Sequence, residues 1–132
     1  ISGIKTFLIT NQPDIARGKV SAESVCAIND SVSQMCGLTD TRMCAHDDPD
    51  DCSCRKPRPG MIIDLANRHK IVLENSVVVG DRWRDVEAGR AAGCLTLFID
   101  YGYNEPLVAE PTWRASSMSE AGLLLRIHCD IF

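Results

Sequence analysis

The amino-acid sequence predicts an α/β fold, namely a Rossmann-like parallel sheet with helices on both faces. Short, mainly apolar runs occupy residues 7–10, 76–81 and 95–99, and segments with apolar residues at helical spacing lie between them. These runs are continuously apolar or rich in β-branched residues, which is typical of strands buried on both faces. Because strands that alternate with helices tend to pair in parallel, the pattern favours a parallel sheet.

The expected helices have recognisable beginnings and ends. Ser21 has the side chain of an N-cap, and Glu23 in the first turn complements the helix dipole. Four apolar residues then recur at helical spacing before a stop at Gly37: Val25, Ile28, Val32 and Met35. A second helix is expected to begin near Pro59 and to place four residues on one face: Ile62, Leu65, Ala66 and His69.

The rest of the chain completes the alternation. We expect a helix over residues 83–92 that ends at Gly93, a loop over 100–111, a short strand over 112–116 and a helix over 119–126. Residues 38–58 are rich in Asp, Cys and Pro and contain no long periodic segment. That stretch is therefore expected to carry a loop rather than a core element.

The composition describes one ordinary domain over residues 1–132. The chain is 45% hydrophobic and 24% charged, and its net charge is −4. This charge excludes the basic surface that nucleic acid or an anionic membrane attracts. No apolar run approaches the ~20 residues of a membrane span, so neither a membrane nor nucleic acid is an expected partner. We expect a monomer or a weak dimer.

The seven cysteines fall into two groups. An odd number cannot form a fully paired disulfide framework within one chain. Four are scattered among apolar residues and are expected to pack in the core: Cys26, Cys36, Cys94 and Cys129. The other three crowd one segment, which points to metal binding in a reducing compartment, the cytoplasm.

The segment 44–54 is predicted to bind zinc. It supplies three thiolates and one imidazole: Cys44, His46, Cys52 and Cys54. This set fills a tetrahedral site and leaves no position for water, so the metal is expected to stabilise the loop rather than to catalyse. Four acids between the ligands are expected to form a solvated tip: Asp47, Asp48, Asp50 and Asp51. The alternative is a flexible acidic loop whose cysteines are incidental.

Three further segments predict phosphoryl chemistry. Thr10 and Asp81 end two expected strands, and ligands of parallel sheets sit beyond those ends. Arg55 and Lys56 follow the metal loop and offer a bidentate fork and a point charge for phosphate. Asp85 lies one helical turn after Asp81, which suits Mg²⁺ shared with a phosphate. Each feature alone has an ordinary alternative, namely a turn, a surface Lys-Pro or a strand-to-loop step.

These segments together resemble the haloacid dehalogenase (HAD) superfamily. Within it they are similar to the zinc-containing subgroup of heptose bisphosphate and histidinol-phosphate phosphatases. Four stretches carry the resemblance: TNQPDIARG at 10–18, the Cys-x-His…Cys-x-Cys loop, RKPRPGM at 55–61 and VGDRWRDVEAG at 79–89. The resemblance implies hydrolysis of a small phosphorylated metabolite through an aspartyl-phosphate, with Mg²⁺ as the catalytic cofactor and Zn²⁺ as the structural one.

The resemblance also implies a role for each motif residue. Thr10 would hydrogen-bond the transferring phosphoryl group, and Lys56 would stabilise its negative charge. Asp81 would bind magnesium, with Asp85 as the supporting acid. Four residues fall where family members contact the rest of the substrate: Asn11, Gln12, Arg55 and Arg82. The zinc ligands match Cys44, His46, Cys52 and Cys54.

The family's first motif, a strand followed by Asp-x-Asp-Gly-Thr, has no counterpart in the chain. The segment Asp48-Pro49-Asp50 lacks a preceding strand, and Asp100 lacks the second acid. We therefore expect the nucleophile to be absent, a central strand to be missing between those that end at Thr10 and Asp81, and the chain to be the C-terminal part of a longer phosphatase. The alternatives are a non-catalytic, zinc-stabilised binding or scaffold domain and a histidinol-phosphate phosphatase.

Overall fold

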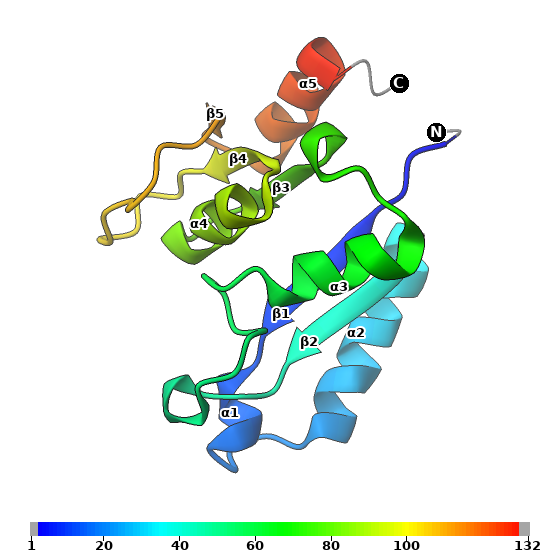
Figure 1. Cartoon of the computed structure of the whole chain (residues 1–132), viewed down its shortest axis with the longest axis vertical. Helices are drawn as coiled ribbons and strands as arrows, with labels where there is room; N and C mark the ends of the chain where they lie inside the picture. Colours follow the sequence, from blue (N-terminus) through cyan, green and yellow to red (C-terminus); the bar gives the residue numbers. More distant parts are fainter. Residues whose placement is uncertain (1–2, 130–132) are drawn as a thin grey trace.

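A computed structural model describes residues 3–129, and in this range five parallel strands form two sheets (Figure 1). The strands are β1 (Phe7–Asn11), β2 (Asp40–Cys44), β3 (Val77–Gly80), β4 (Leu95–Ile99) and β5 (Trp113–Ala115). The helices are α1 (Pro13–Ala16), α2 (Ala22–Cys36), α3 (Gly60–His69), α4 (Trp83–Ala92) and α5 (Met118–Cys129). Two 3-10 turns, Asp48–Asp50 and Leu73–Asn75, complete the elements, and none of the described helices is long and apolar enough to cross a membrane.

The predicted parallel α/β arrangement is confirmed, but the sheet is interrupted. One sheet has the order β1-β2 and the other the order β3-β4-β5, and every pair within them is parallel. No ladder joins β1 to β3 in the described residues. The interruption lies where the sequence predicts a missing central strand.

Helices cover both faces of the three-stranded sheet, as the continuously apolar strands predict. On one face, Val77 packs against a cluster formed by β4, β5 and α5: Leu97, Ile99, Ala115 and Ala121. On the other face, Val78 packs against residues of α3 and α4: Ile62, Ala88 and Ala92. Ile9 of β1 contacts this second cluster, so hydrophobic packing joins the two sheets where hydrogen bonds do not.

Strand β2 was not predicted, because its sequence lacks the usual signal. It is polar at Asp40, Thr41 and Arg42, and its backbone groups are satisfied by β1 in parallel register. The Arg42 guanidinium lies 3.1 Å from Asp40 and 2.5 Å from Asp64 of α3. Ion pairs formed only in the folded chain therefore replace the apolar pattern that identifies most buried strands.

The prediction that the four scattered cysteines pack in the core was wrong for Cys26 and Cys36, both in α2. Helix α2 buries Val25 and Asn29, whereas Ile28 and Met35 are 63% and 79% exposed. The buried residues of α2 are thus four positions apart, and one of them, Asn29, is polar. A pattern of apolar residues does not predict the burial of a polar side chain. Cys26 and Cys36 lie on the exposed part of the same helix, while Cys94 and Cys129 are partly buried.

At the amino ends of β1 and β2, the carboxylate of Asp40 is hydrogen-bonded to a histidine of α3. His69 Nε2 lies 2.7 Å from Asp40 Oδ2, and the hydrogen bond from His69 lowers the pKa of Asp40 to about 2. Because this pKa lies below the unfolded value of 3.8, its stabilisation is full above pH 3.8 and is lost as the pH falls through 2.

Asp40→Asn is accordingly expected to lower the free energy of unfolding at pH 7 by about 1 to 2 kcal/mol, measured by denaturant titration. A carboxyl ¹³C NMR titration of the wild-type protein should locate the Asp40 midpoint near 2. A midpoint at the ordinary value would contradict the stabilising role of this pair.

Candidate active site and metal loop

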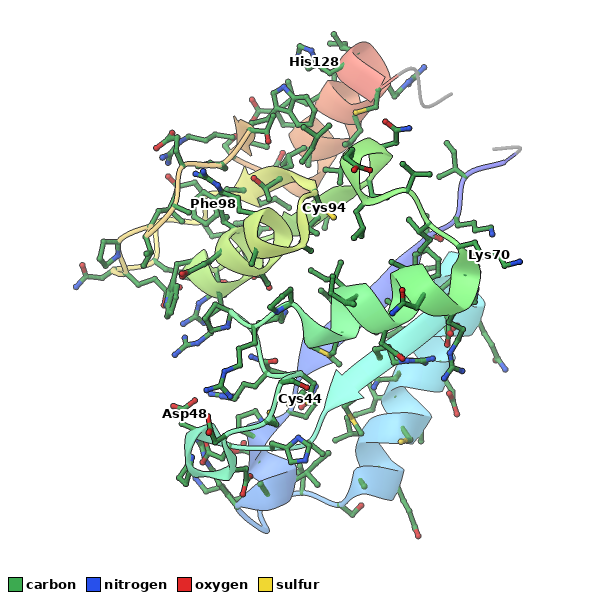
Figure 2. The ribbon with its side chains drawn as sticks, viewed as in Figure 1. Cys44, Asp48, Lys70, Cys94, Phe98 and His128 are labelled. Carbon is green, nitrogen blue, oxygen red and sulfur yellow. The ribbon has the colours of Figure 1, made fainter. Side chains whose placement is uncertain are left out.

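The four predicted zinc ligands converge after β2. Their ligand atoms all lie within 4.8 Å of one another, and Cys44, the last residue of β2, is fully buried. Cys44 Sγ lies 3.0 Å from Cys54 Sγ and 3.6 Å from Cys52 Sγ, and His46 Nδ1 lies 3.3 Å from Cys54 Sγ. Figure 2 shows Cys44 where β2 enters the loop that carries Asp48. Three thiols and one imidazole at this spacing fit a closed tetrahedral zinc site.

The two loop thiols differ in acidity. Burial alone would raise the pKa of Cys52, but hydrogen bonds from backbone N–H groups, that of Arg55 first, lower this pKa to about 7. Burial raises the pKa of Cys54 to about 12, and the neighbouring thiols of Cys44 and Cys52 add to the effect. A coordinated divalent cation deprotonates its thiol ligands outright, so metal binding releases protons from this loop.

The acids of the loop are more than the solvated tip that the sequence suggested. Asp47 accepts a hydrogen bond from Arg17 Nε at 2.6 Å, and Asp48 accepts one from Arg55 Nε at 2.6 Å. Arg58 pairs with Asp51 at 2.7 Å. Asp47 also caps the 3-10 turn of the loop. Arg17 at the end of α1, together with Arg55 and Arg58 between the metal loop and α3, thus neutralises and orders the acids of the loop.

The metal loop leads directly into the next motif. Cys52 Sγ accepts the backbone N–H of Arg55 at 3.3 Å. Asn11, at the end of β1, clamps the following residue, since its Oδ1 accepts the N–H of Lys56 at 3.0 Å and its Nδ2 donates to the Lys56 carbonyl at 3.2 Å. The side chain of Asn11, which was predicted to contact substrate, therefore fixes the backbone of Lys56.

A cavity of about 340 Å³ lies at the carboxyl ends of β1 and β3. Ile9 lines it from one sheet and Asp81 from the other, together with Lys56 and Asp85. Lys56 Nζ donates to Asp85 Oδ1 at 2.6 Å, and both side chains are nearly buried, at 13% and 11% exposure. The structure therefore places the predicted cation and the two predicted acids at one site, although 25 residues separate Lys56 from Asp81.

Asp85 serves two partners at once. Its Oδ1 accepts Lys56, and its Oδ2 accepts the backbone N–H of Arg82 at 3.1 Å, which satisfies the N-terminus of α4. The carboxylate packs directly over Gly80, where an added Cβ would meet the Asp85 side chain at 2.3 Å. The glycine at the end of β3 therefore makes room for the acid.

Gly80→Ala is expected to displace Asp85, to destabilise the protein by about 1 to 3 kcal/mol, and to weaken the Lys56 ion pair. Denaturant unfolding measures the first effect, and the resonance position of the Lys56 ammonium measures the second. Gly122→Ala is the matched control, because nothing lies within 4 Å of its added Cβ and alanine favours the helix. Equal stabilities for the two variants would contradict the close approach at Gly80.

Thr10 and Gln12 form a small network at the end of β1. Gln12 Nε2 donates to Thr10 Oγ1 at 3.0 Å. Because the Gln12 N–H group occupies a lone pair of the threonine oxygen, the hydroxyl keeps its own proton for another acceptor. This is the state in which a hydroxyl can donate to an oxyanion.

The two arginines predicted to contact substrate both have carboxylate partners. Arg55 binds Asp48, and its Nη1 is buried without a hydrogen-bond partner among residues 3–129. Arg82 forms two hydrogen bonds with Glu105, at 2.8 and 2.7 Å. Glu105 and Tyr103 were not predicted as site residues, because they lie in a loop with no periodic signal. Tyr103 Oη donates to Asp81 Oδ2 at 3.0 Å.

Residues 53–121, which include Lys56, Asp81 and Asp85, match the HAD-hydrolase-like family, and the chain belongs to this family of hydrolases. The resemblance drawn from the motifs is thereby confirmed. The chain is 38% identical over 108 residues to the D-glycero-beta-D-manno-heptose-1,7-bisphosphate 7-phosphatase of Bordetella bronchiseptica, a match that covers 78% of this chain and 60% of that protein. The enzyme of the same name from Rhodopseudomonas palustris is 38% identical over 104 residues, which cover 70% of this chain and 58% of that protein.

A solved structure shows the same fold. The D,D-heptose 1,7-bisphosphate phosphatase of B. bronchiseptica, crystallised with magnesium and phosphate, superposes with a TM-score of 0.78 at 29% sequence identity. The match covers 92% of this chain and 73% of that one. The chain thus has the HAD-like fold, and it spans about three fifths of the length of the two curated relatives described above.

Proposed function

We propose that the chain forms part of a magnesium-dependent phosphatase that hydrolyses a small phosphorylated sugar, with D-glycero-D-manno-heptose 1,7-bisphosphate as the first candidate. The observation that carries the proposal is the shared cavity in which Lys56, Asp85 and Asp81 meet at the ends of parallel strands. A lysine beside two carboxylates, within hydrogen-bonding reach of one of them, suits a phosphoryl group and the hard cation that accompanies it.

The nucleophilic aspartate is proposed to lie on a strand between β1 and β3, supplied by a segment outside the present chain. Among residues 3–129, each of these strands bonds to a neighbour on one side only, and both contribute to the walls of the same cavity. Unpaired backbone groups inside a sheet are costly, so a strand inserted here would pair both edges. The greater length of the relatives agrees with such a segment.

In the proposed reaction, the carboxylate of that aspartate attacks phosphorus, the bond to the sugar oxygen breaks, and water hydrolyses the aspartyl-phosphate. Magnesium, when bound, neutralises phosphoryl and carboxylate oxygens. Asp81 would hold the cation, and Lys56 would stabilise charge on the phosphoryl oxygens while Asp85 orients it. Thr10, whose oxygen already accepts a hydrogen bond from Gln12, would donate its proton to a phosphoryl oxygen.

The zinc loop is proposed to position the catalytic lysine, and Arg55 and Arg82 are proposed to contact the substrate. Zinc at Cys44, His46, Cys52 and Cys54 would hold the segment that carries Arg55 and Lys56 in place. Arg55 offers a buried Nη1 donor without a partner in the described part of the chain, and the half-exposed Arg82 directly follows the cavity residue Asp81. Two guanidinium groups beside a phosphoryl site suit a substrate with a second anionic group.

A phosphatase assay on the protein expressed from its complete gene tests this proposal. The panel contains heptose 1,7-bisphosphate, histidinol phosphate and several hexose monophosphates, with Mg²⁺ and then with EDTA. We expect turnover that requires Mg²⁺ and is fastest with the bisphosphate. Preference for histidinol phosphate would overturn the sugar substrate. No turnover of any ester would overturn the enzymatic function in favour of a binding or scaffold domain.

A further inference from the structure

The loop that follows β4 folds back onto the end of β3. Besides the bond from its Tyr103 hydroxyl to Asp81, this loop is anchored through Glu105, which binds Arg82 through both carboxylate oxygens and accepts the backbone N–H of Trp83 at 3.4 Å. The Arg82 guanidinium also lies 5.1 Å from the centre of the Tyr103 ring. The phenol is therefore held over Asp81 by two independent contacts to Arg82, one through its ring and one through Glu105.

We propose that Tyr103 is a positioning residue for the candidate magnesium ligand Asp81. Its hydroxyl engages Oδ2 of the carboxylate, so that Oδ1 remains for a cation in the cavity shared with Lys56 and Asp85. This proposal rests on the proposed function, because it takes Asp81 as the magnesium ligand. A carboxylate that binds a metal through one oxygen is commonly oriented by a hydrogen bond to the other, and loss of such a bond typically costs 10- to 100-fold in metal affinity.

A purely structural role explains the tyrosine hydroxyl poorly. Tyr103 is 49% exposed, so its hydrogen bond to Asp81 forms in contact with water and adds little to stability. The loop is anchored separately by Glu105. Removing the hydroxyl should therefore leave the fold intact and change the behaviour of Asp81 alone.

Tyr101 provides a matched control in the same loop. It is 51% exposed, similar to Tyr103, and its ring lies 6.1 Å from the Tyr103 ring. Among the residues that the structure describes, its hydroxyl makes no hydrogen bond to Asp81. Tyr101 lines the same cavity as Asp81, so Tyr101→Phe removes a hydroxyl from the same loop and the same site but no hydrogen bond to the acid.

The test is isothermal titration of the zinc-loaded full protein with Mg²⁺ alone. Tyr103→Phe is expected to raise the dissociation constant about 10-fold, with an unchanged thermal midpoint. Tyr101→Phe should stay within about twofold of the wild type, and Asp81→Asn should lose the site. Glu105→Gln, which weakens the anchor but keeps the phenol, should have a smaller effect than Tyr103→Phe.

The outcomes distinguish the magnesium site at Asp81 from the positioning role of Tyr103. If Asp81→Asn loses Mg²⁺ while Tyr103→Phe binds as tightly as the wild type, the positioning role is wrong and the magnesium site stands. If the wild type binds no Mg²⁺, or if Asp81→Asn binds it equally well, Asp81 is not a magnesium ligand. The positioning role of Tyr103 is then wrong as well. An equal loss in Tyr101→Phe and Tyr103→Phe would assign the effect to the loop and overturn the specific role of the Asp81 bond.

Discussion

Cys44→Ser is expected to abolish stoichiometric zinc binding and to destabilise the protein by about 4 kcal/mol. Cys44 is fully buried, and its sulfur lies within 3.6 Å of ligand atoms from each of the other three positions. The variant would leave two thiols and an imidazole in close contact, without the cation that holds them together. Elemental analysis for zinc and denaturant unfolding, with and without EDTA, measure the two effects.

Cys26→Ser is the control for this prediction, because Cys26 is an exposed cysteine of α2 outside the metal loop. It should keep about one zinc per chain and the stability of the wild type. EDTA should lower the stability of the wild type and of Cys26→Ser but leave that of Cys44→Ser almost unchanged. Wild-type protein that is well folded and free of metal would show that the loop does not depend on zinc.

Lys56→Ala is expected to lower kcat/KM of the complete enzyme by about 10³-fold and its stability by about 3 kcal/mol. The stability effect follows from the nearly buried partner, since Asp85 would retain its charge without the ammonium 2.6 Å away. The kinetic effect follows from the loss of the cation in the cavity. Steady-state assays with Mg²⁺ and denaturant unfolding measure the two quantities separately.

A double variant separates charge pairing from catalysis. Lys56→Met combined with Asp85→Asn removes both charges of the buried pair but keeps an oxygen for the Arg82 N–H, so it should recover much of the lost stability while activity stays absent. Lys19→Ala, at an exposed position outside the cavity, should match the wild type in both respects. Full activity in Lys56→Ala would contradict the role proposed for this lysine.

The zinc loop and the strand ends were predictable because their signals are local. All four ligands fall within residues 44–54, and a ligand set so close in sequence needs no knowledge of the fold to be noticed. Thr10 and Asp81 follow apolar runs, and parallel strands bring their carboxyl ends to one edge. Lys56 and Asp81 share a cavity at that edge, to which β1 contributes Ile9.

The features that were missed depend on residues far apart in the chain. Strand β2 is polar and is stabilised by pairing with β1 and by ion pairs to α3, so no apolar period marks it. Asn11 clamps the backbone of Lys56, 45 positions away. Tyr103 reaches Asp81 across 22 positions, from a loop whose path no pattern in the sequence describes.

The amino-acid sequence by itself determined the parallel α/β class, the composition of the metal loop and the residue types at the strand ends. These follow from hydrophobic period, from ligand chemistry and from short-range spacing, all of which act within a few residues. The tertiary structure alone decided the pairing of Lys56 with Asp85, the bond from Tyr103 to Asp81 and the clamp of Asn11 on the backbone of Lys56. Such contacts arise only when packing brings distant segments together, because hydrogen bonds and ion pairs act over a few ångströms and leave no period in the sequence.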